Sequence, residues 1–473
     1  MLQVKETLVG TAILGAGPTG IGAAWRLSQH SSSNHPNDSL LPFLLLDECT
    51  TPGGRAASYT TPEGFTFDYG GHVLFPHAEY SEFIELIDKV VPAWHWSVPI
   101  RGVWIANRFL PTPVQRNIHR LPLSVLAECV WGLMRRSPVE TNGAEPNLQL
   151  YLEGQFGEAL TRHVMAPLNH KMWAHDPRDL GSAWSLHRSG SHERNIPDVR
   201  VRDVLRNLLL NRNDPGWRQS TKVRYPLTGG CGAIWRAIFD LLPDNVRRLG
   251  SRALTLEAQK KKIWFADGSG VRYQHLLSSI PLDRLLGLMR DRPDLQARSR
   301  EFRAARVQLF GFGLTCPMPA VLRDVHAINV PSSDVPFWRL NLPSSFSPGN
   351  VPDPDRTWSI LCECSLGQGS AKRYQPDQIE AALRQMGFLA PSTKVVSIFT
   401  SEVEHGYPVP FAGRDKLLNE VQRELEELGI YSRGRFGGWR YEVSNQDHAF
   451  MQGVEVVDRL RDGKAESTYR KTW

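Results

Sequence analysis

The sequence feature that most constrains the fold is a glycine-rich turn near the N-terminus, Gly15-Ala16-Gly17-Pro18-Thr19-Gly20. An apolar run at residues 11–14 precedes this turn, and a helix-like segment at 21–27 follows it. The order predicts a strand, a tight turn and a helix whose N-terminus and backbone amides face a diphosphate. The motif alone also fits an ordinary glycine turn. In this context we predict a dinucleotide site that includes Gly15, Gly17 and Gly20.

A second apolar run, Phe43-Leu44-Leu45-Leu46, ends at Asp47, whose carboxylate is placed to accept hydrogen bonds from ribose hydroxyls. The polar residues 30–38 before this run are predicted to form a surface loop. Two later motifs, Gly53-Gly54-Arg55 and Gly70-Gly71-His72, allow the backbone to approach a ligand closely. Taken together, these features resemble FAD-binding flavoproteins of the amine-oxidase type and not nicotinamide dehydrogenases.

Length and composition fit an enzyme with two or three domains, because 473 residues exceed one ordinary core and 41% of them are apolar. The net charge of +6 is spread along the chain, and we interpret its densest cluster, Lys260-Lys261-Lys262, as a solvated face. We therefore expect no nucleic-acid partner. No apolar segment is long enough to span a bilayer and residues 1–10 lack a signal-peptide pattern, which predicts a cytoplasmic protein without a membrane partner. The six cysteines form no C-x-x-C pair and are predicted to be reduced.

Apolar periodicity predicts an α/β protein in which other domains interrupt the nucleotide-binding one. Residues 121–136 and 148–173 have helical spacing; a hairpin at 253–273, a strand at 275–281 and a β-rich part at 307–364 follow. The predicted fold is a Rossmann-like FAD-binding domain with an inserted helical domain and a β-sheet substrate domain. The expected bounds are 1–96 with 220–300 and 405–473 for the FAD-binding domain, 118–215 for the helical domain, and 97–117 with 301–404 for the sheet domain.

The C-terminal part is predicted to return to helices. A helical stripe at 417–428 stops at Gly429, and a last helix ends before Gly463. Between them, residues 431–441 are too rich in glycine and arginine for a routine strand. The last helix begins near Asn445 and Gln446, where its amides and positive dipole end would face an electron-rich ring.

Residues 430–450, Ile-Tyr-Ser-Arg-Gly-Arg-Phe-Gly-Gly-Trp-Arg-Tyr-Glu-Val-Ser-Asn-Gln-Asp-His-Ala-Phe, resemble the C-terminal signature of the UDP-galactopyranose mutases, particularly the eukaryotic type. Residues 70–77, 169–174 and 405–408 are similar to other landmarks of that family. The similarity extends over nearly the whole chain.

The resemblance implies a mutase that interconverts pyranose and furanose forms of a nucleoside-diphosphate hexose without net redox change. In that family reduced FAD attacks the anomeric carbon through N5 and displaces the diphosphate. The implied catalytic residues are His72, Arg188, Arg339, Tyr407 and Tyr441. The implied cofactor residues are Gly15, Gly17, Gly20, Asp47, Gly53, Gly54, Gly71, Arg435, Asn445 and Gln446, and the substrate residues are Gln115, Asn169, Trp173, Asn329 and Phe346. NAD(P)H is a candidate reductant, and self-association into a homo-oligomer is a further candidate property.

Departures from the family pattern concern the nucleotide. Asn329 and Phe346 stand where the eukaryotic type has tyrosines, and Thr112, Val164 and Leu168 stand where it has aromatics around uridine. Each lost base–aromatic contact is worth about 1–3 kcal/mol. A purine would refill the space, so we slightly favour a GDP-hexose, with UDP-galactose next. In the simpler alternative, other side chains fill the site and UDP still binds.

Histidines and carboxylates gather between residues 163 and 193, with His170 and His175 as candidate metal ligands. Their spacing matches no compact ligand motif, so we predict a solvated helical surface and no metal. Three rival functions stay open: the same mutase reaction with a divalent metal and no flavin, an amine-oxidase-like FAD oxidoreductase, and a non-catalytic nucleotide-sugar-binding protein.

Overall fold

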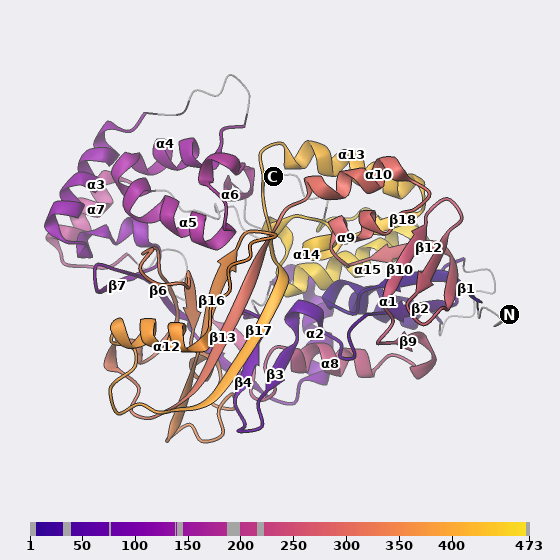
Figure 1. Cartoon of the computed structure of the whole chain (residues 1–473), viewed down its shortest axis with the longest axis horizontal. Helices are drawn as coiled ribbons and strands as arrows, with labels where there is room; N and C mark the ends of the chain where they lie inside the picture. Colours follow the sequence, from indigo (N-terminus) through magenta and orange to yellow (C-terminus); the bar gives the residue numbers. More distant parts are fainter. Residues whose placement is uncertain are drawn as a thin grey trace.

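The computed structural model describes residues 6–31, 39–74, 77–137, 139, 145–186, 199–214 and 222–469 (Figure 1). Two large sheets and a group of helices make up these parts of the chain. One sheet lies near the N-terminus, the second near the middle of the molecule, and helices α3 to α7 lie at the far end (Figure 1). The α/β class and the Rossmann-like first sheet predicted from the sequence are confirmed.

The first sheet is built around strand β1, which pairs in parallel with a strand on each side. Its order is β10 (Ala253–Glu257), β11 (Lys262–Phe265), β12 (Gly270–Ser278), β1 (Glu6–Leu14), β2 (Phe43–Leu46) and β9 (Arg247–Arg248), with β18 (Ile430–Ser432) also paired to β12. Such continuous apolar strands are typical of a parallel sheet covered on both faces. Both predicted strands flanking the glycine turn are therefore confirmed.

Helices cover both faces of this sheet. On one face pack α1 (Pro18–Ser31), α2 (Ser81–Val90), α8 (Gly232–Asp240) and α15 (Gln446–Asp462). On the other pack α9 (Leu282–Gly287), α10 (Pro293–Arg298) and α13 (Arg414–Glu427). The predicted C-terminal helices are confirmed, and Gly429 and Gly463 adopt left-handed φ values of 74° and 70° just after α13 and α15.

The sequence prediction divided β12 wrongly. We expected a hairpin to end at 273 and a new strand to begin at 275, but β12 runs unbroken from Gly270 to Ser278 alongside β1. Residues 271–278 contain neither glycine nor proline, so nothing in the chain interrupts the strand there. The glycine- and arginine-rich segment resolves into the short strand β18 and helix α14 (Gly434–Gly437).

The second sheet supplies a long, mostly antiparallel wall. Its order is β17 (Val395–Pro408), β13 (Ala304–Thr315), β16 (Thr357–Leu366), β15 (Arg339–Asn341), β14 (Val325–Asn329), β6 (Ile100–Ile105) and β7 (Arg108–Pro111). Helix α12 (Pro376–Gln385) packs on one face through Ile379 and Leu383. Two small pairs, β3 (Ser58–Thr60) with β4 (Thr66–Asp68) and β5 (Trp94–Ser97) with β8 (Val223–Pro226), connect the sheets.

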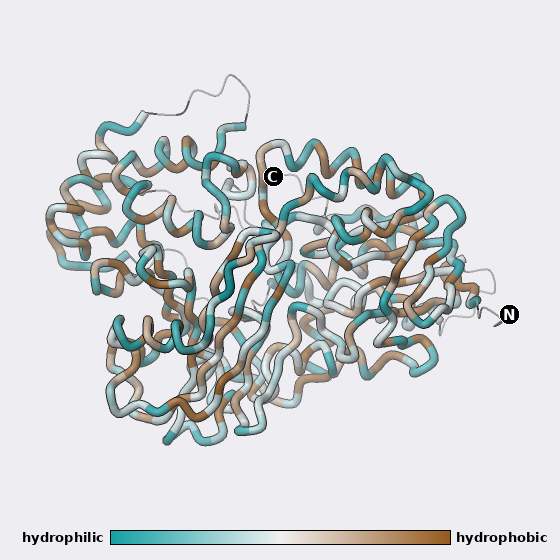
Figure 2. The backbone as a smooth tube through the Cα atoms, in the orientation of Figure 1, coloured by the Kyte–Doolittle hydropathy of each residue, from teal (hydrophilic) through white to brown (hydrophobic). Residues whose placement is uncertain are grey.

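The helical part contains α3 (Leu123–Arg135), α4 (Leu148–Leu160), α5 (Ala166–Trp173), α6 (Ala183–Leu186) and α7 (Val201–Leu209). The tube in Figure 2 shows hydrophobic and hydrophilic residues alternating along these helices, as the predicted periodicity requires. Their apolar faces share one core with Leu309 and Tyr407 of the second sheet. We propose that the chain divides into the three predicted domains, with the boundary expected after residue 404 shifted to the end of β17 at Pro408.

Two simpler predictions also meet the structure. No disulfide joins any of the six cysteines, all of which lie in the described parts, and four of them are buried. No helix in the described parts of the chain combines the length and the apolar character that crossing a bilayer requires.

Candidate active site

A cavity of about 1120 Å³ joins the glycine-rich turn of the first sheet to the inner face of the second sheet. Most of the residues predicted from the sequence lie on its wall. They are Gly15, Gly17, Asp47, Gly54, Gly71, His72, Asn329, Arg339, Phe346, Tyr407, Arg435, Tyr441, Asn445 and Gln446. Gly20 and Gly53 lie just behind this wall, and the residues 187–198 that contain Arg188 are outside the described part of the chain.

The glycines of the turn have different tasks. A Cβ on Gly20 would lie 1.8 Å from the carbonyl oxygen of Gly15, so only glycine lets helix α1 start so close to the strand. A Cβ on Gly17 would meet nothing within 4 Å, because this backbone faces the open cavity. The second glycine loop is fixed to the turn, since the Gly53 amide donates to the Ala16 carbonyl at 2.8 Å. The turn therefore offers free backbone where a diphosphate would lie.

Asp47 holds the turn and the end of β2 together. Its Oδ2 accepts from the Ala16 amide at 2.6 Å, and its Oδ1 accepts from the Cys49 amide at 2.7 Å. Burial raises the pKa of Asp47, and the two amide bonds oppose that rise. Each carboxylate oxygen keeps a second lone pair for a ribose hydroxyl.

Arg55 is a cation on the cavity wall. Its guanidinium forms no direct hydrogen bond or ion pair with any described residue. Burial and the neighbouring Arg284 lower the pKa of Arg55 to about 10, whereas the charge of Glu404 opposes this shift. A partly buried guanidinium without a directly bound anion is stabilised when an anionic ligand joins it. The donor set at this end of the cavity therefore suits a phosphate-bearing ligand.

Glu363 of β16 is the centre of the second-sheet wall, and only 1% of its side chain is exposed. Arg339 donates to both carboxylate oxygens, with Nε to Oε1 and Nη2 to Oε2 each at 2.9 Å. The hydroxyl of Tyr407 donates to Oε2 at 2.9 Å, and Asn341 Nδ2 donates to Oε1 at 2.7 Å. The Gly71 amide donates to Oε1 at 3.0 Å. One carboxylate thus fixes an arginine, a tyrosine and the loop that carries His72.

The electrostatics of this cluster keep its arginine charged. Burial alone would lower the pKa of Arg339, but the Glu363 carboxylate raises it well above its usual value. Arg339 also donates from Nη2 to the Tyr407 hydroxyl at 3.1 Å and lies over the Trp338 ring at 4.5 Å. Burial raises the pKa of Tyr407, so its hydroxyl stays protonated. This arrangement presents a fixed cation and a phenol to an anionic group.

His72 lies on the cavity wall as a neutral imidazole. Burial lowers its pKa to about 4, and the positive charge of Arg435 contributes in the same direction. Its Nδ1 is buried and has no hydrogen-bond partner. An unpaired buried nitrogen in a cavity marks a place where a ligand group can bind.

Tyr441 and Arg435 complete the wall near α15. The Arg435 guanidinium lies 5.2 Å from the Tyr441 ring and 5.5 Å from the Tyr407 ring. Gln446 lies at the start of α15, where its Oε1 accepts from the Trp235 indole at 2.7 Å. Arg435, Asn445 and Gln446 of the C-terminal signature thus line the same cavity as Gly15 and Gly17.

The predicted base-binding residues Gln115, Asn169 and Trp173 are buried and do not line the cavity. Asn169 Nδ2 donates to the Met165 carbonyl at 2.8 Å, and its Oδ1 accepts from the Trp173 indole at 3.2 Å. Trp173 packs edge-on against Tyr441, with ring centroids 5.0 Å apart. In this structure these residues therefore support the wall from behind.

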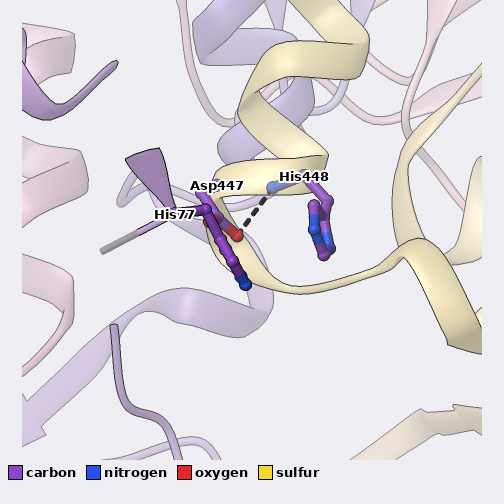
Figure 3. Close-up of side chains that lie close together, drawn as sticks. All are labelled: His77, Asp447 and His448. Atoms are coloured by element: carbon purple, nitrogen blue, oxygen red, sulfur yellow. Dashed lines mark hydrogen bonds and ion pairs between the residues drawn. The ribbon is translucent and has the colours of Figure 1, made fainter. Parts of the chain in front are cut away.

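The candidate metal ligands His170 and His175 belong to no group of converging ligand atoms among the described residues. One such group exists elsewhere, at His77, Asp447 and His448 (Figure 3). Asp447 binds His77 Nδ1 and accepts from the His448 amide at 2.8 Å, and the two imidazoles stack at 5.1 Å. His448 Nδ1 accepts from the Asn445 amide, whereas a histidine that binds a metal through one nitrogen carries a proton on the other. We interpret this group as a structural contact that links the loop after His72 to helix α15.

Sequence reasoning missed Glu363 and Asn341 as site residues. Both lie in strands that look like ordinary sheet, and their role depends on partners far away in the sequence. The one available signal was a glutamate in the middle of the otherwise apolar run Ile360–Cys364. A charged residue in such a place is buried only when it is paired.

A family model described as an NAD(P)-binding Rossmann-like domain matches residues 13–90. Among solved structures, a reduced UDP-galactopyranose mutase is 33% identical, with a TM-score of 0.88, and the match covers 98% of each chain. Cyclohexylamine oxidase from Brevibacterium oxydans IH-35A is 15% identical with a TM-score of 0.67, covering 96% of this chain and 99% of that one. A fatty acid isomerase from P. acnes is 13% identical with a TM-score of 0.58, covering 96% and 98%.

The fold places the chain among proteins built on a Rossmann-like domain, an architecture that the cyclohexylamine oxidase and the fatty acid isomerase share. The sequence identity of 33% to the UDP-galactopyranose mutase, over 98% of each chain, then shows the family. The chain belongs to the UDP-galactopyranose mutase family and is an enzyme of the mutase class.

Proposed function

We propose that this enzyme interconverts the pyranose and furanose forms of a nucleoside-diphosphate hexose with reduced FAD as its cofactor. The observation that carries the proposal is the shared cavity. It joins the free backbone of the glycine turn to the paired cluster of Arg339, Tyr407 and Glu363. A dinucleotide cofactor and the diphosphate of a substrate would thus meet in one enclosed space.

The residues present fit FAD. Gly17 leaves open space at the turn, Arg55 is a cation on the cavity wall without a direct hydrogen bond to a described residue, and His72 Nδ1 is an unpaired nitrogen. When bound, reduced FAD would supply the nucleophile for the anomeric carbon. Asn445, Gln446 and Arg435 would hold it from the C-terminal side. We further propose NAD(P)H as the reductant, which anaerobic bleaching of the yellow colour would test.

The chain's own residues would bind the leaving diphosphate. Arg339 keeps its charge because of Glu363, and Tyr407 keeps its proton because of burial. Fixed donors aimed at developing charge stabilise it without reorganisation in the transition state. We propose Arg188 as a second diphosphate ligand on the family resemblance, and Tyr441 as a hydroxyl donor on the same wall.

For the nucleotide we favour GDP-hexose slightly over UDP-galactose. Thr112, one of the three positions where the eukaryotic type has aromatic side chains around uridine, lines the cavity, which supports a larger base there. Phe346 is held against Tyr225 at 5.8 Å and would contribute one aromatic surface. Competition between GDP and UDP for the reduced enzyme tests this choice. GDP binding as tight as UDP or tighter supports the purine, and UDP binding much tighter than GDP excludes it.

The reaction itself is tested by assaying nucleoside-diphosphate hexoses with and without dithionite, and with and without EDTA. We expect a yellow protein that turns over substrate only when reduced and is indifferent to the chelator. A colourless protein that is inactivated by EDTA would favour the metal-dependent mutase. Oxidation of amines without conversion of any nucleotide sugar would favour the oxidoreductase, whose fold the amine oxidases share.

A further inference from the structure

Lys171 of helix α5 is a partly buried ammonium surrounded by backbone carbonyls. Its Nζ lies 2.9 Å from the carbonyl oxygen of Val330, 2.6 Å from that of Ser332, 3.0 Å from that of Val335 and 2.7 Å from that of Phe337. No carboxylate of a described residue forms an ion pair with it. Four oxygens share three N–H donors, so the charge is held by the carbonyl dipoles of one loop.

The loop around Lys171 connects the two strands that carry Asn329 and Arg339. It closes at its base, where the Val330 amide donates to the Trp338 carbonyl at 2.7 Å. The Trp338 amide in turn donates to the Glu363 carbonyl at 3.0 Å. The Trp338 ring lies under the Arg339 guanidinium at 4.5 Å. The loop therefore sets the position of the backbone from which Arg339 reaches Glu363.

Lys171 also belongs to helix α5, which packs against the tyrosines of the site. Lys171 lies two residues from Asn169 and two from Trp173, which bond to each other. Trp173 packs on Tyr441 at 5.0 Å and on Tyr407 at 6.0 Å. One ammonium thus joins the helical wall behind the tyrosines to the strand pair that presents the arginine.

We propose that Lys171 is a positioning residue that couples helix α5 to Arg339 and so aligns the two sides of the substrate site. The inference rests on the proposed function only for the identity of the substrate. It acts on the diphosphate end of the cavity and not on the glycine turn, because none of the four carbonyls belongs to the first sheet. Removal of the ammonium leaves four acceptors without a cation and releases the loop.

The test compares Lys171→Met with Lys171→Arg and with Lys260→Met, an exposed lysine on the first-sheet side of the molecule. Amide hydrogen exchange of the full-length protein is followed by mass spectrometry. We expect faster exchange in peptides covering 330–341 for Lys171→Met, a smaller increase for Lys171→Arg, and none for Lys260→Met. Unchanged exchange at 330–341 in Lys171→Met would overturn the positioning claim.

The second part of the test measures the nucleotide affinity of the Lys171 variants. We expect Lys171→Met to bind GDP and UDP about tenfold more weakly than wild type while it retains the same flavin content. In an Arg339→Met background the same change should cost nothing further, because Lys171 acts through Arg339. The inference would be contradicted if the loss of nucleotide affinity in the double variant equalled the product of the two single losses. Loss of flavin from Lys171→Met would contradict it as well. If the wild-type protein binds neither nucleotide, the proposed function fails and with it the substrate half of the inference.

Discussion

The two halves of the cavity are built by different means. The nucleotide half is a backbone turn shaped by Gly15, Gly17 and Gly20 inside six residues and held from outside by Asp47 and Gly53. The second-sheet half is a carboxylate, Glu363, with donors from positions 71, 339, 341 and 407. Local sequence therefore specifies the first half, whereas the second exists only after the sheet has formed.

Replacement of Glu363 by glutamine should have the largest effect. The change keeps the shape but removes the buried counter-charge of Arg339, whose own side chain is partly buried. Breaking a buried ion pair in this way costs about 3–5 kcal/mol of unfolding free energy. Urea denaturation would measure the loss, with Glu257→Gln as a control at a strand end outside the cavity. A midpoint equal to that of wild type would show that the cluster does not depend on this charge.

Two substitutions in the glycine turn should have different effects, one on folding stability and the other on cofactor binding. Gly20→Ala would force a Cβ against the Gly15 carbonyl, so we expect a loss of several kcal/mol in stability, within the range known for overpacked sites. Gly17→Ala has room for its Cβ and should leave the apoprotein's unfolding midpoint unchanged while weakening FAD binding. Thermal unfolding of the apoproteins and flavin titration would measure the two effects. Equal losses of stability in both variants would contradict the division of tasks.

His72 should make stability depend on pH in a defined direction. Its folded pKa is about 4, below the usual value near 6.5, so the unfolded state binds more protons between these values. Stability is therefore lost as pH falls from about 6.5 toward 4. Between pH 7 and pH 5 we expect wild type to lose about 1–2 kcal/mol more than His72→Asn, after allowance for partial exposure. If the unfolding free energies of the two proteins depended on pH in the same way, the pKa of His72 in the folded state would not be lowered.

Chelation should have the smallest effect. The group of His77, Asp447 and His448 is satisfied by its own hydrogen bonds, with His448 Nδ1 used as an acceptor. EDTA dialysis should leave the unfolding midpoint and the flavin spectrum unchanged. Metal analysis that finds a stoichiometric divalent ion in the purified protein would overturn our interpretation of this group.

How far the sequence predicts the molecule depends on how local each feature is. Strands β1 and β2, the helices α13 and α15 and the glycine turn between β1 and α1 were predictable, because each follows from a contiguous pattern or a cap such as Gly463. The role of Glu363 was not, because its apolar surroundings in β16 indicate burial but its donors come from positions far away in the sequence. The burial of Asn169 and Trp173 behind the wall was also beyond prediction, since the packing of α5 against the second sheet decides it.

The account's central claim is that one cavity holds both the flavin and the substrate's diphosphate. The most direct measurement is a titration of the purified yellow protein with GDP and UDP while its visible spectrum is recorded. We predict a saturable perturbation of the flavin bands in the wild-type protein that is lost in Arg339→Ala, while the flavin content stays the same. An unperturbed spectrum at saturating nucleotide, or an identical perturbation in Arg339→Ala, would contradict the claim.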